Sequence, residues 1–170
     1  MRVELENLEG GKGEFAHVYP PDELNPIDER AQLTDPVAVS GKVRVAGNEV
    51  FVSGHIDTRA RVECDRCLQP VELPVNTDFA LEYISGADYE SSAAAELTEA
   101  DMSVSVFDGE AIDIDEIVKE QILLTVPART LCREDCKGIC PECGIDRNTG
   151  ECSCVTNDTD PRWAALKNLA

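Results

Sequence analysis

Apolar and polar residues alternate along three stretches of the first half of the chain, as they do in strands that bury one face. The stretches cover residues 37–45, 50–64 and 71–83. Turn-forming residues at Ala46–Glu49 separate the first two stretches, which therefore predict a long antiparallel hairpin, and the third predicts the next strand. Shorter alternations predict an edge strand within residues 2–6 and a further strand within 102–107.

Two segments lack a clear period and are predicted to connect these elements. Residues 15–36 are interrupted by several prolines, so we expect mostly connection there, with a weak helical pattern over 27–33. Residues 85–101 are rich in Ser, Ala and Glu and predict an acidic surface loop.

The period changes from two to that of a helix after residue 111. Residues 112–124 place apolar side chains on one stripe, which is formed by Ile114, Ile117, Val118 and Ile122. Asp113 and Glu116 have the spacing of a capping box, and Pro127 cannot continue the helix. This main helix is predicted to cover one side of the sheet.

The last residues predict a second, short helix. Asp160 and Pro161 suit its first turn, and Trp163 and Leu166 share one of its faces. Trp163 is the only tryptophan, and we expect it either to pack on the core or to anchor a partner.

The eight cysteines fall into four close pairs. The pairs are Cys64/Cys67, Cys132/Cys136, Cys140/Cys143 and Cys152/Cys154. Zinc accepts four thiolates in a tetrahedron, and two cysteines separated by two or three residues can turn both sulfurs toward one ion. Each pair is therefore half of a four-cysteine site, and the count predicts two zinc ions.

The segment Cys140–Gly144 has the pattern of a zinc knuckle, because Pro141 restricts the turn and Gly144 lets backbone N–H groups point at a thiolate. The predicted ligands are Cys64, Cys67, Cys132 and Cys136 for site 1, and Cys140, Cys143, Cys152 and Cys154 for site 2. A competing grouping places Cys136, Cys140, Cys143 and Cys154 around one ion.

These features together predict an α+β fold: an antiparallel sheet or partly closed barrel with one main helix, plus a C-terminal cysteine-rich zinc module. The expected domains are a sheet domain over 1–127 that carries the Cys64/Cys67 knuckle, a zinc-binding module over 128–156 and a terminal helix over 157–170. Because residues 132–154 hold little aliphatic material, the metal has to supply the stability of that module.

Other cysteine chemistry is disfavoured. Residues 136–143 match the spacing of a radical-enzyme iron–sulfur cluster, but those enzymes need a large barrel that this chain cannot build. Cys64 and Cys67 could form a redox pair, yet they lie between strands and not at a helix start, where a thiolate is favoured. A catalytic zinc would keep an open ligand position, whereas eight thiols for two ions predict closed structural sites. No catalytic residue is expected.

The formal net charge is −19, from 15 basic and 34 acidic residues. Nucleic-acid binders need a basic surface, so the charge favours a basic protein partner over freestanding nucleic-acid binding. Six basic residues nevertheless gather near site 1 in the sequence and could contact phosphate or a partner together with Trp163. They are Arg59, Arg61, Arg66, Arg129, Arg133 and Lys137. The alternative is that they compensate the charge of the thiolates and neighbouring acids.

The chain is expected to be cytoplasmic and to have no membrane partner. No run of eighteen apolar residues occurs, and residues 1–6 lack the apolar stretch of a signal peptide. In a reducing compartment, paired cysteines are more often metal ligands than disulfides.

Four motifs in this order resemble the bacterial YceD family. They are Val62–Leu68 with the strand after it, Ile112–Pro127, the Cys140–Gly144 knuckle and Asp160–Leu166. Members of that family are associated with accumulation or processing of 23S ribosomal RNA, and their genes commonly neighbour that of a small basic ribosomal protein. The resemblance implies ribosome biogenesis.

We therefore expect a non-enzymatic factor for synthesis, processing or stability of 23S rRNA, with no small-molecule substrate. The expected partner is a basic large-subunit ribosomal protein, the 23S rRNA precursor, or both. The alternative function is a thiol oxidoreductase that uses Cys64 and Cys67.

Overall fold

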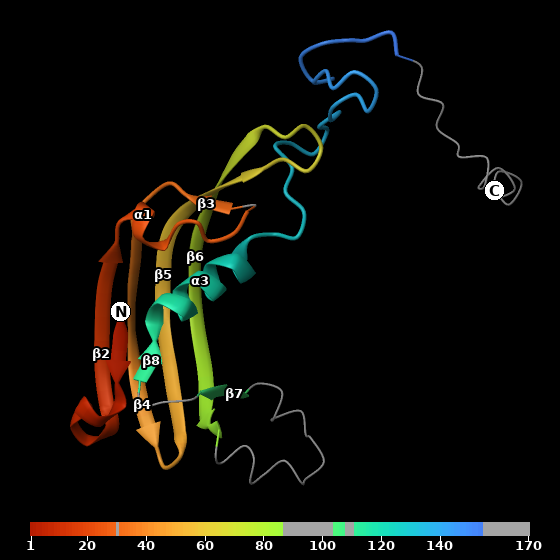
Figure 1. The fold of residues 1–170 in the computed structure, drawn as a ribbon. Coiled ribbons are helices and arrows are strands. Elements are labelled where there is room, and N and C mark those ends of the chain that lie inside the picture. The colour runs from red at the N-terminus through yellow and green to blue at the C-terminus, as the bar shows by residue number, and fades with distance from the viewer. Residues whose placement is uncertain (30, 87–103, 108–110, 155–170) are drawn as a thin grey trace, which may run out of the picture. The chain divides into compact units, whose positions relative to one another are not determined.

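The computed structural model describes residues 1–29, 31–86, 104–107 and 111–154. The chain forms two compact units (Figure 1). Unit 1 consists of Met1–Val62 and Glu72–Ala128, and unit 2 of Glu63–Val71 and the chain from Arg129. The predicted terminal helix with Trp163, and the predicted acidic loop from residue 87 onward, lie outside the described residues.

Unit 1 is built on a six-stranded sheet with the order β2-β4-β5-β6-β7, in which β3 also pairs with β5. The strands are β2 (Lys12–Tyr19), β3 (Ala31–Leu33), β4 (Val37–Ala46), β5 (Glu49–Glu63), β6 (Pro70–Ser85) and β7 (Val104–Phe107). The sheet is open, so of the two predicted alternatives the structure has the sheet and not the partly closed barrel.

The predicted hairpin is β4 and β5, which pair antiparallel from Ala38↔Asp57 to Ala46↔Glu49. Gly47 in the turn has a φ of +65°, a conformation that glycine adopts without strain. At the far edge, β6 and β7 run parallel, with Glu82 opposite Val104. The sheet is therefore mixed, and the expectation of a purely antiparallel sheet was wrong at this edge. A parallel pair needs a long crossover, and residues 86–103 provide the length.

The strand β2 was not predicted from the sequence. It pairs antiparallel with β4, from Lys12↔Arg44 to Tyr19↔Val37. Tyr19 is its only buried residue, and the alternation of exposed and half-buried residues over 12–16 stops at His17 and Val18, which are both exposed. An edge strand buries less side-chain surface than a central one, which is why residues 15–19 were mistaken for connection.

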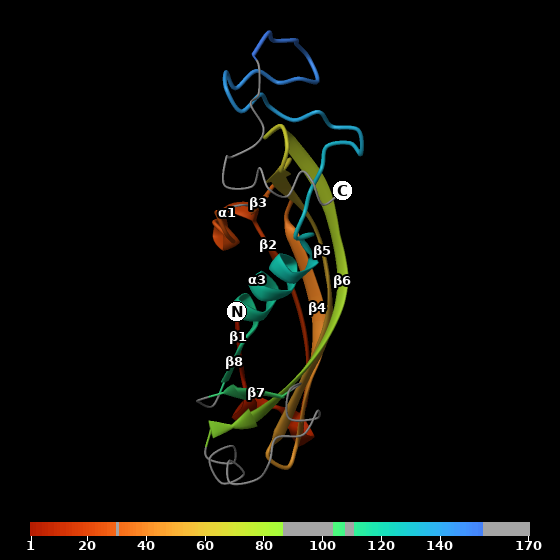
Figure 2. The same ribbon diagram turned by 90° about the vertical axis from the view of Figure 1, so that its right-hand side faces the viewer.

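The main helix, α3 (Ile114–Thr125), lies across one face of the sheet (Figure 2). The Asp113 side chain caps it by accepting a 3.0 Å hydrogen bond from the Asp115 N–H, and the helix ends at Val126, before Pro127. The predicted apolar stripe is buried and joins the sheet's inward valines in one core. The members of the stripe are Ile114, Ile117, Val118 and Ile122.

Smaller elements complete unit 1. The strands β1 (Arg2–Glu4) and β8 (Ala111–Asp113) pair antiparallel immediately before α3. Three short helical turns connect other elements: η1 (Leu5–Asn7), η2 (Glu9–Gly11) and α1 (Pro21–Leu24). Among the described residues, no helix has the length and apolar content to cross a membrane.

Unit 2 has little regular structure in its described residues. Apart from the ends of β5 and β6, it contains an isolated antiparallel bridge between Ile139 and Asp146. Most of its buried residues are cysteines, so thiol groups and not aliphatic side chains form the interior of this unit.

Candidate metal centres

The eight cysteines of unit 2 lie in two groups of four, and in each group all sulfur atoms are within 4.8 Å of one another. The groups are Cys64, Cys67, Cys132 and Cys136 (site 1) and Cys140, Cys143, Cys152 and Cys154 (site 2). Each group could hold a metal ion. Cys136 lies in the first group and not with Cys140, as the competing grouping would require.

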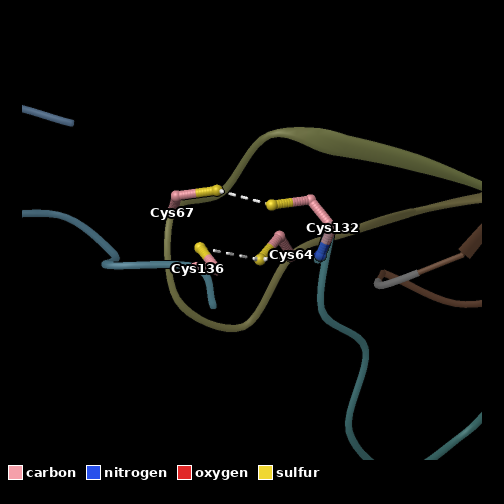
Figure 3. A group of neighbouring side chains, drawn as sticks. All are labelled: Cys64, Cys67, Cys132 and Cys136. Atoms are coloured by element: carbon pink, nitrogen blue, oxygen red, sulfur yellow. Dashed lines mark hydrogen bonds between the residues drawn. The ribbon is translucent and has the colours of Figure 1, made fainter. Parts of the chain in front are cut away.

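The sulfurs of site 1 have the spacing that a tetrahedral zinc ion requires. Cys64 Sγ lies 3.9 Å from Cys136 Sγ, and Cys67 Sγ lies 3.6 Å from Cys132 Sγ, with the four side chains turned toward one another (Figure 3). Thiolates bound about 2.3 Å from zinc in a tetrahedron are about 3.8 Å apart. A disulfide would bring two sulfurs to about 2.0 Å. The donor set therefore fits a tetrathiolate metal site.

The knuckle of site 2 is held by two backbone hydrogen bonds. The Gly144 N–H donates to the Cys140 carbonyl at 2.8 Å, and the Cys140 N–H donates to the Ile145 carbonyl at 2.9 Å. Gly144 has a φ of +73°, the left-handed conformation that glycine allows. The zinc-knuckle pattern predicted from Cys140–Gly144 is thus present as a closed turn that carries Cys140 and Cys143.

The loop between β5 and β6 repeats this knuckle with a different sequence. The Leu68 N–H donates to the Cys64 carbonyl at 2.9 Å, and the Cys64 N–H donates to the Gln69 carbonyl at 2.9 Å. Leu68 takes the place of the glycine and has a φ of +60°, which is uncommon for a residue with a side chain. The two ligand pairs are therefore presented by equivalent turns.

Two hydrogen bonds, one between main-chain groups and one from main chain to side chain, join the first knuckle to the segment that supplies the other ligands of site 1. The Asp65 N–H donates to the Thr130 carbonyl at 2.9 Å, and the Thr130 N–H donates to Asp65 Oδ2 at 2.6 Å. The Ile139 N–H also donates to the Arg66 carbonyl at 2.9 Å. The residues between the two cysteines of this knuckle thus position the second ligand pair, a role that sequence reasoning did not assign.

Electrostatics within site 1 favour two thiolates and oppose two, because the pKa values of Cys64 and Cys136 are lowered whereas those of Cys67 and Cys132 are raised. Burial of Cys64 acts against ionisation, but N–H groups of Arg66 and Cys132 donate to its sulfur and lower the pKa of Cys64 to about 6. The pKa of Cys132 is raised to about 12, by removal of its sulfur from water and by the neighbouring sulfurs. Four adjacent thiolates would repel one another, so full deprotonation of the site requires a cation.

Site 2 also combines a thiol of lowered pKa with one of raised pKa, and it is more open than site 1. Backbone N–H groups of Cys143 and Glu142 lower the pKa of Cys140 to about 6, although burial acts in the opposite direction. Hydrogen bonding to Cys143 raises the pKa of Cys154 to about 12. Cys140 is buried, whereas Cys143 and Cys154 are exposed, so site 2 presents sulfur to solvent where site 1 is largely enclosed.

Zinc affinity of site 1 is expected to rise with pH. At pH 7 the Cys64 thiol, with a pKa of about 6, is ionised, whereas Cys132, with a pKa of about 12, keeps its proton. A metal ion must displace each remaining proton, which contributes roughly a tenfold change in affinity per pH unit. Chelator competition with the Cys140→Ser, Cys143→Ser variant between about pH 6.5 and 7.5 measures this. An affinity that stays constant, after correction for the chelator's own protonation, would contradict it.

Two of the basic residues predicted near site 1 belong to unit 1 and are paired there. Arg59 Nε lies 3.6 Å from Asp35 Oδ2, and Arg61 Nε lies 2.7 Å from Glu72 Oε1. The hydrogen bond from Arg61 is the main reason why the pKa of Glu72 is lowered. The charges of both arginines are therefore compensated by carboxylates.

The other basic residues belong to unit 2: Arg66, Arg129, Arg133 and Lys137. Arg66 Nη1 donates to the Cys136 carbonyl at 2.7 Å, and Arg133 Nη2 donates to Asn148 Oδ1 at 2.7 Å. Arg66 therefore holds the backbone at Cys136, whereas Arg133 holds the Asn148 side chain and also lies 3.4 Å from Asp135 Oδ1. Trp163, the remaining predicted partner contact, lies outside the described residues.

Comparison with known proteins gives the family of this chain. Residues 52–170 match the family described as "Large ribosomal RNA subunit accumulation protein YceD". The chain belongs to the YceD family. The family name implies a role in accumulation of the large-subunit ribosomal RNA, and the resemblance noted in the sequence is confirmed.

Individual relatives extend over most of the chain. An uncharacterised protein of Mycobacterium tuberculosis (strain ATCC 25618 / H37Rv) is 35% identical over 147 residues, which are 86% of this chain and 66% of the relative. The chain thus spans just under two thirds of the mycobacterial protein. YlbN of Bacillus subtilis is 29% identical over 159 residues, 92% of this chain and 87% of YlbN.

A plant protein carries the YceD name itself. The chloroplastic "Large ribosomal RNA subunit accumulation protein YCED homolog 1" of Arabidopsis thaliana is 31% identical over 58 residues, which are 34% of this chain and 18% of the plant protein. No solved structure matches the chain. The YceD relationship therefore rests on sequence, and the cysteine geometry comes from this structure.

Proposed function

We propose that this protein is a non-enzymatic, cytoplasmic ribosome biogenesis factor that supports synthesis, processing or stability of 23S rRNA. The observation that carries the proposal is the YceD family match over residues 52–170. In support of the non-enzymatic part, each of the two cysteine clusters among the described residues offers four thiols, which would fill the four positions around a tetrahedral zinc ion.

Zinc is the metal that we assign to both sites. Four thiolates without other donors suit zinc, and the sulfur spacing of site 1 matches a tetrahedron. When bound, zinc would supply positive charge that lets adjacent thiolates ionise. The chain's own part is to bring the ligand pairs together through two equivalent knuckles, and the result is a stable unit 2 and not a catalytic centre.

The proposed partner is a basic large-subunit ribosomal protein, the 23S rRNA precursor, or both. The net charge of −19 favours the protein, and most of the excess acid lies in the sequence of unit 1. Arg59, Arg61 and Arg133 are each paired with an exposed carboxylate, with which a phosphate group would have to compete. The proposed contacts are Arg59, Arg61, Arg66, Arg129, Arg133, Lys137 and Trp163.

The alternative use of Cys64 and Cys67 as a redox pair has less support. Cys64 is 0% exposed and Cys67 is 4% exposed, so another protein's thiol has no access to their sulfurs. Cys64 Sγ also lies 3.9 Å from Cys136 Sγ, so Cys64 and Cys67 do not form an isolated pair of thiols. Burial therefore favours ligation over thiol exchange.

Depletion of the protein tests the proposed function. We expect lower mature 23S rRNA relative to 16S rRNA, or accumulation of 23S precursors, measured by primer extension and RNA gel electrophoresis. Re-expression of the wild-type chain should restore the ratio. Unchanged precursor and mature 23S levels after verified depletion would rule the proposal out. Crosslinking in cells, followed by sequencing of attached RNA and peptides, then separates a protein partner from an RNA partner.

A further inference from the structure

The turn Asp146–Gly150 is part of the chain that forms site 2, yet one of its side chains reaches site 1. Asn148 Nδ2 lies 3.4 Å from Cys136 Sγ and donates a hydrogen bond to it. Cys136 is a site 1 sulfur, whereas Asn148 lies between the two ligand pairs of site 2 in the sequence. The Asn148 side chain therefore connects the turn between the ligand pairs of site 2 with a ligand of site 1.

Every polar group of the Asn148 side chain is used, which fixes its orientation. Its Oδ1 accepts hydrogen bonds from the Lys137 N–H at 2.8 Å and from Arg133 Nη2 at 2.7 Å. Its Nδ2 also donates to Asp146 Oδ1 at 2.6 Å. If the amide were rotated by 180°, Nδ2 would face the Lys137 N–H and Arg133 Nη2, which are also hydrogen-bond donors. Nδ2 must therefore face the Cys136 sulfur.

The position of Asn148 depends on the hairpin that carries the site 2 knuckle. The Arg147 N–H donates to the Gly138 carbonyl at 2.9 Å, next to the bridge between Ile139 and Asp146. The Gly150 N–H closes the turn on the Asp146 carbonyl at 2.9 Å. The hairpin in turn encloses the Cys140 knuckle, so disorder in site 2 would displace Asn148 from Cys136.

The residue before Asn148 serves the other cluster. The Arg147 side chain hydrogen bonds to the Cys140 sulfur. Adjacent residues of one turn thus contact sulfurs of different sites: Arg147 contacts site 2 and Asn148 contacts site 1. Non-ligand groups that donate to metal-bound atoms typically change metal affinity by about 10- to 100-fold.

We propose that the turn Asp146–Gly150 links the two metal sites so that they fill cooperatively, with Asn148 as the positioning residue that transmits occupancy of site 2 to site 1. This inference rests on metal binding as proposed above. Because linkage is reciprocal, occupancy of site 1 strengthens site 2 by the same factor. The partly loaded protein is consequently a minor species, and the protein responds to zinc supply as one two-ion unit.

Native mass spectrometry of the full chain during stepwise zinc addition measures this directly. The wild-type protein is expected to show mainly the zero-ion and two-ion forms, with the one-ion form well below its statistical share. The Asn148→Ala variant is expected to accumulate the one-ion form and to bind its second ion roughly 10- to 100-fold more weakly. Thiol alkylation of that form, followed by peptide mapping, should label the cysteines of site 1.

The matched control is Thr149→Ala in the same turn. Thr149 Oγ1 donates to the Asp146 carbonyl at 3.2 Å and is exposed, and its titration should match that of the wild type. A statistical population of the one-ion form in the wild-type titration overturns the linkage and leaves metal binding intact. Absence of any bound ion overturns both. Equal one-ion populations in wild type and Asn148→Ala remove Asn148 from the linkage.

Discussion

Removing the metal is expected to unfold unit 2 and to leave unit 1 folded. Among the described residues, the buried cluster at site 1 consists of Cys64, Cys67 and Cys136, and Val71 and Leu131 are packed partly against it. So small an apolar core cannot offset the entropy of ordering residues 129–154. Structural zinc contributes an apparent free energy of about 10–16 kcal/mol in small zinc modules, far more than these contacts. Unit 1 has its own core of valine, leucine and isoleucine and does not need the ion.

Hydrogen exchange of the full chain, read by mass spectrometry before and after chelation, separates the two units. Peptides from residues 63–71 and 129–154 should lose protection, whereas peptides from β4, β5 and α3 should keep it. Re-addition of zinc should restore the original pattern, which controls for damage by the chelator. Unchanged protection of residues 129–154 in protein verified to be free of metal would contradict the role that we assign to the clusters.

Truncation of the α3 core residue Ile122 is expected to destabilise unit 1 by about 2–5 kcal/mol. Ile122 is 0% exposed and lies in the apolar core between the helix and the sheet, so the variant loses buried methylene groups and leaves a cavity. Leu124, two residues later on the same helix, is 71% exposed and provides the matched control. Leu124→Ala should change the free energy of unfolding by less than about 0.5 kcal/mol.

Denaturant unfolding followed by circular dichroism, in the presence of excess zinc, measures both variants against the wild type. Excess zinc keeps unit 2 in its metal-bound state, so the difference in the free energy of unfolding between variant and wild type reports the stability of unit 1. Equal losses of stability for Ile122→Ala and Leu124→Ala would show that α3 does not pack through the face described above.

The parts of the fold that could be predicted are those with strong periodicity. The hairpin β4–β5 and the helix α3 both bury one complete face, so their sequences alternate with the period of their structure. The strand β2 could not be found this way, because an edge strand with exposed His17 and Val18 buries too little. The parallel pairing of β7 depends on a crossover that leaves no local pattern.

The candidate site divides in the same manner. The cysteine pairs have ligand spacing, so the two groups of four could be proposed from sequence and recur in the structure as neighbouring sulfurs. The residues that position those sulfurs carry no such spacing. Asp65 acts through hydrogen bonds to Thr130, and Asn148 through hydrogen bonds to Cys136 and its neighbours, which only the folded structure shows.

The long separation of the site 1 ligands has a consequence during protein synthesis. Cys64 and Cys136 lie 72 residues apart, a stretch that takes roughly 4 to 14 seconds to translate. Throughout this interval the growing polypeptide carries two thiols whose counterparts have yet to be made, while the four cysteines of site 2 follow one another within about 1 to 3 seconds. The earliest moment at which site 1 can assemble is therefore set by elongation and not by formation of the sheet.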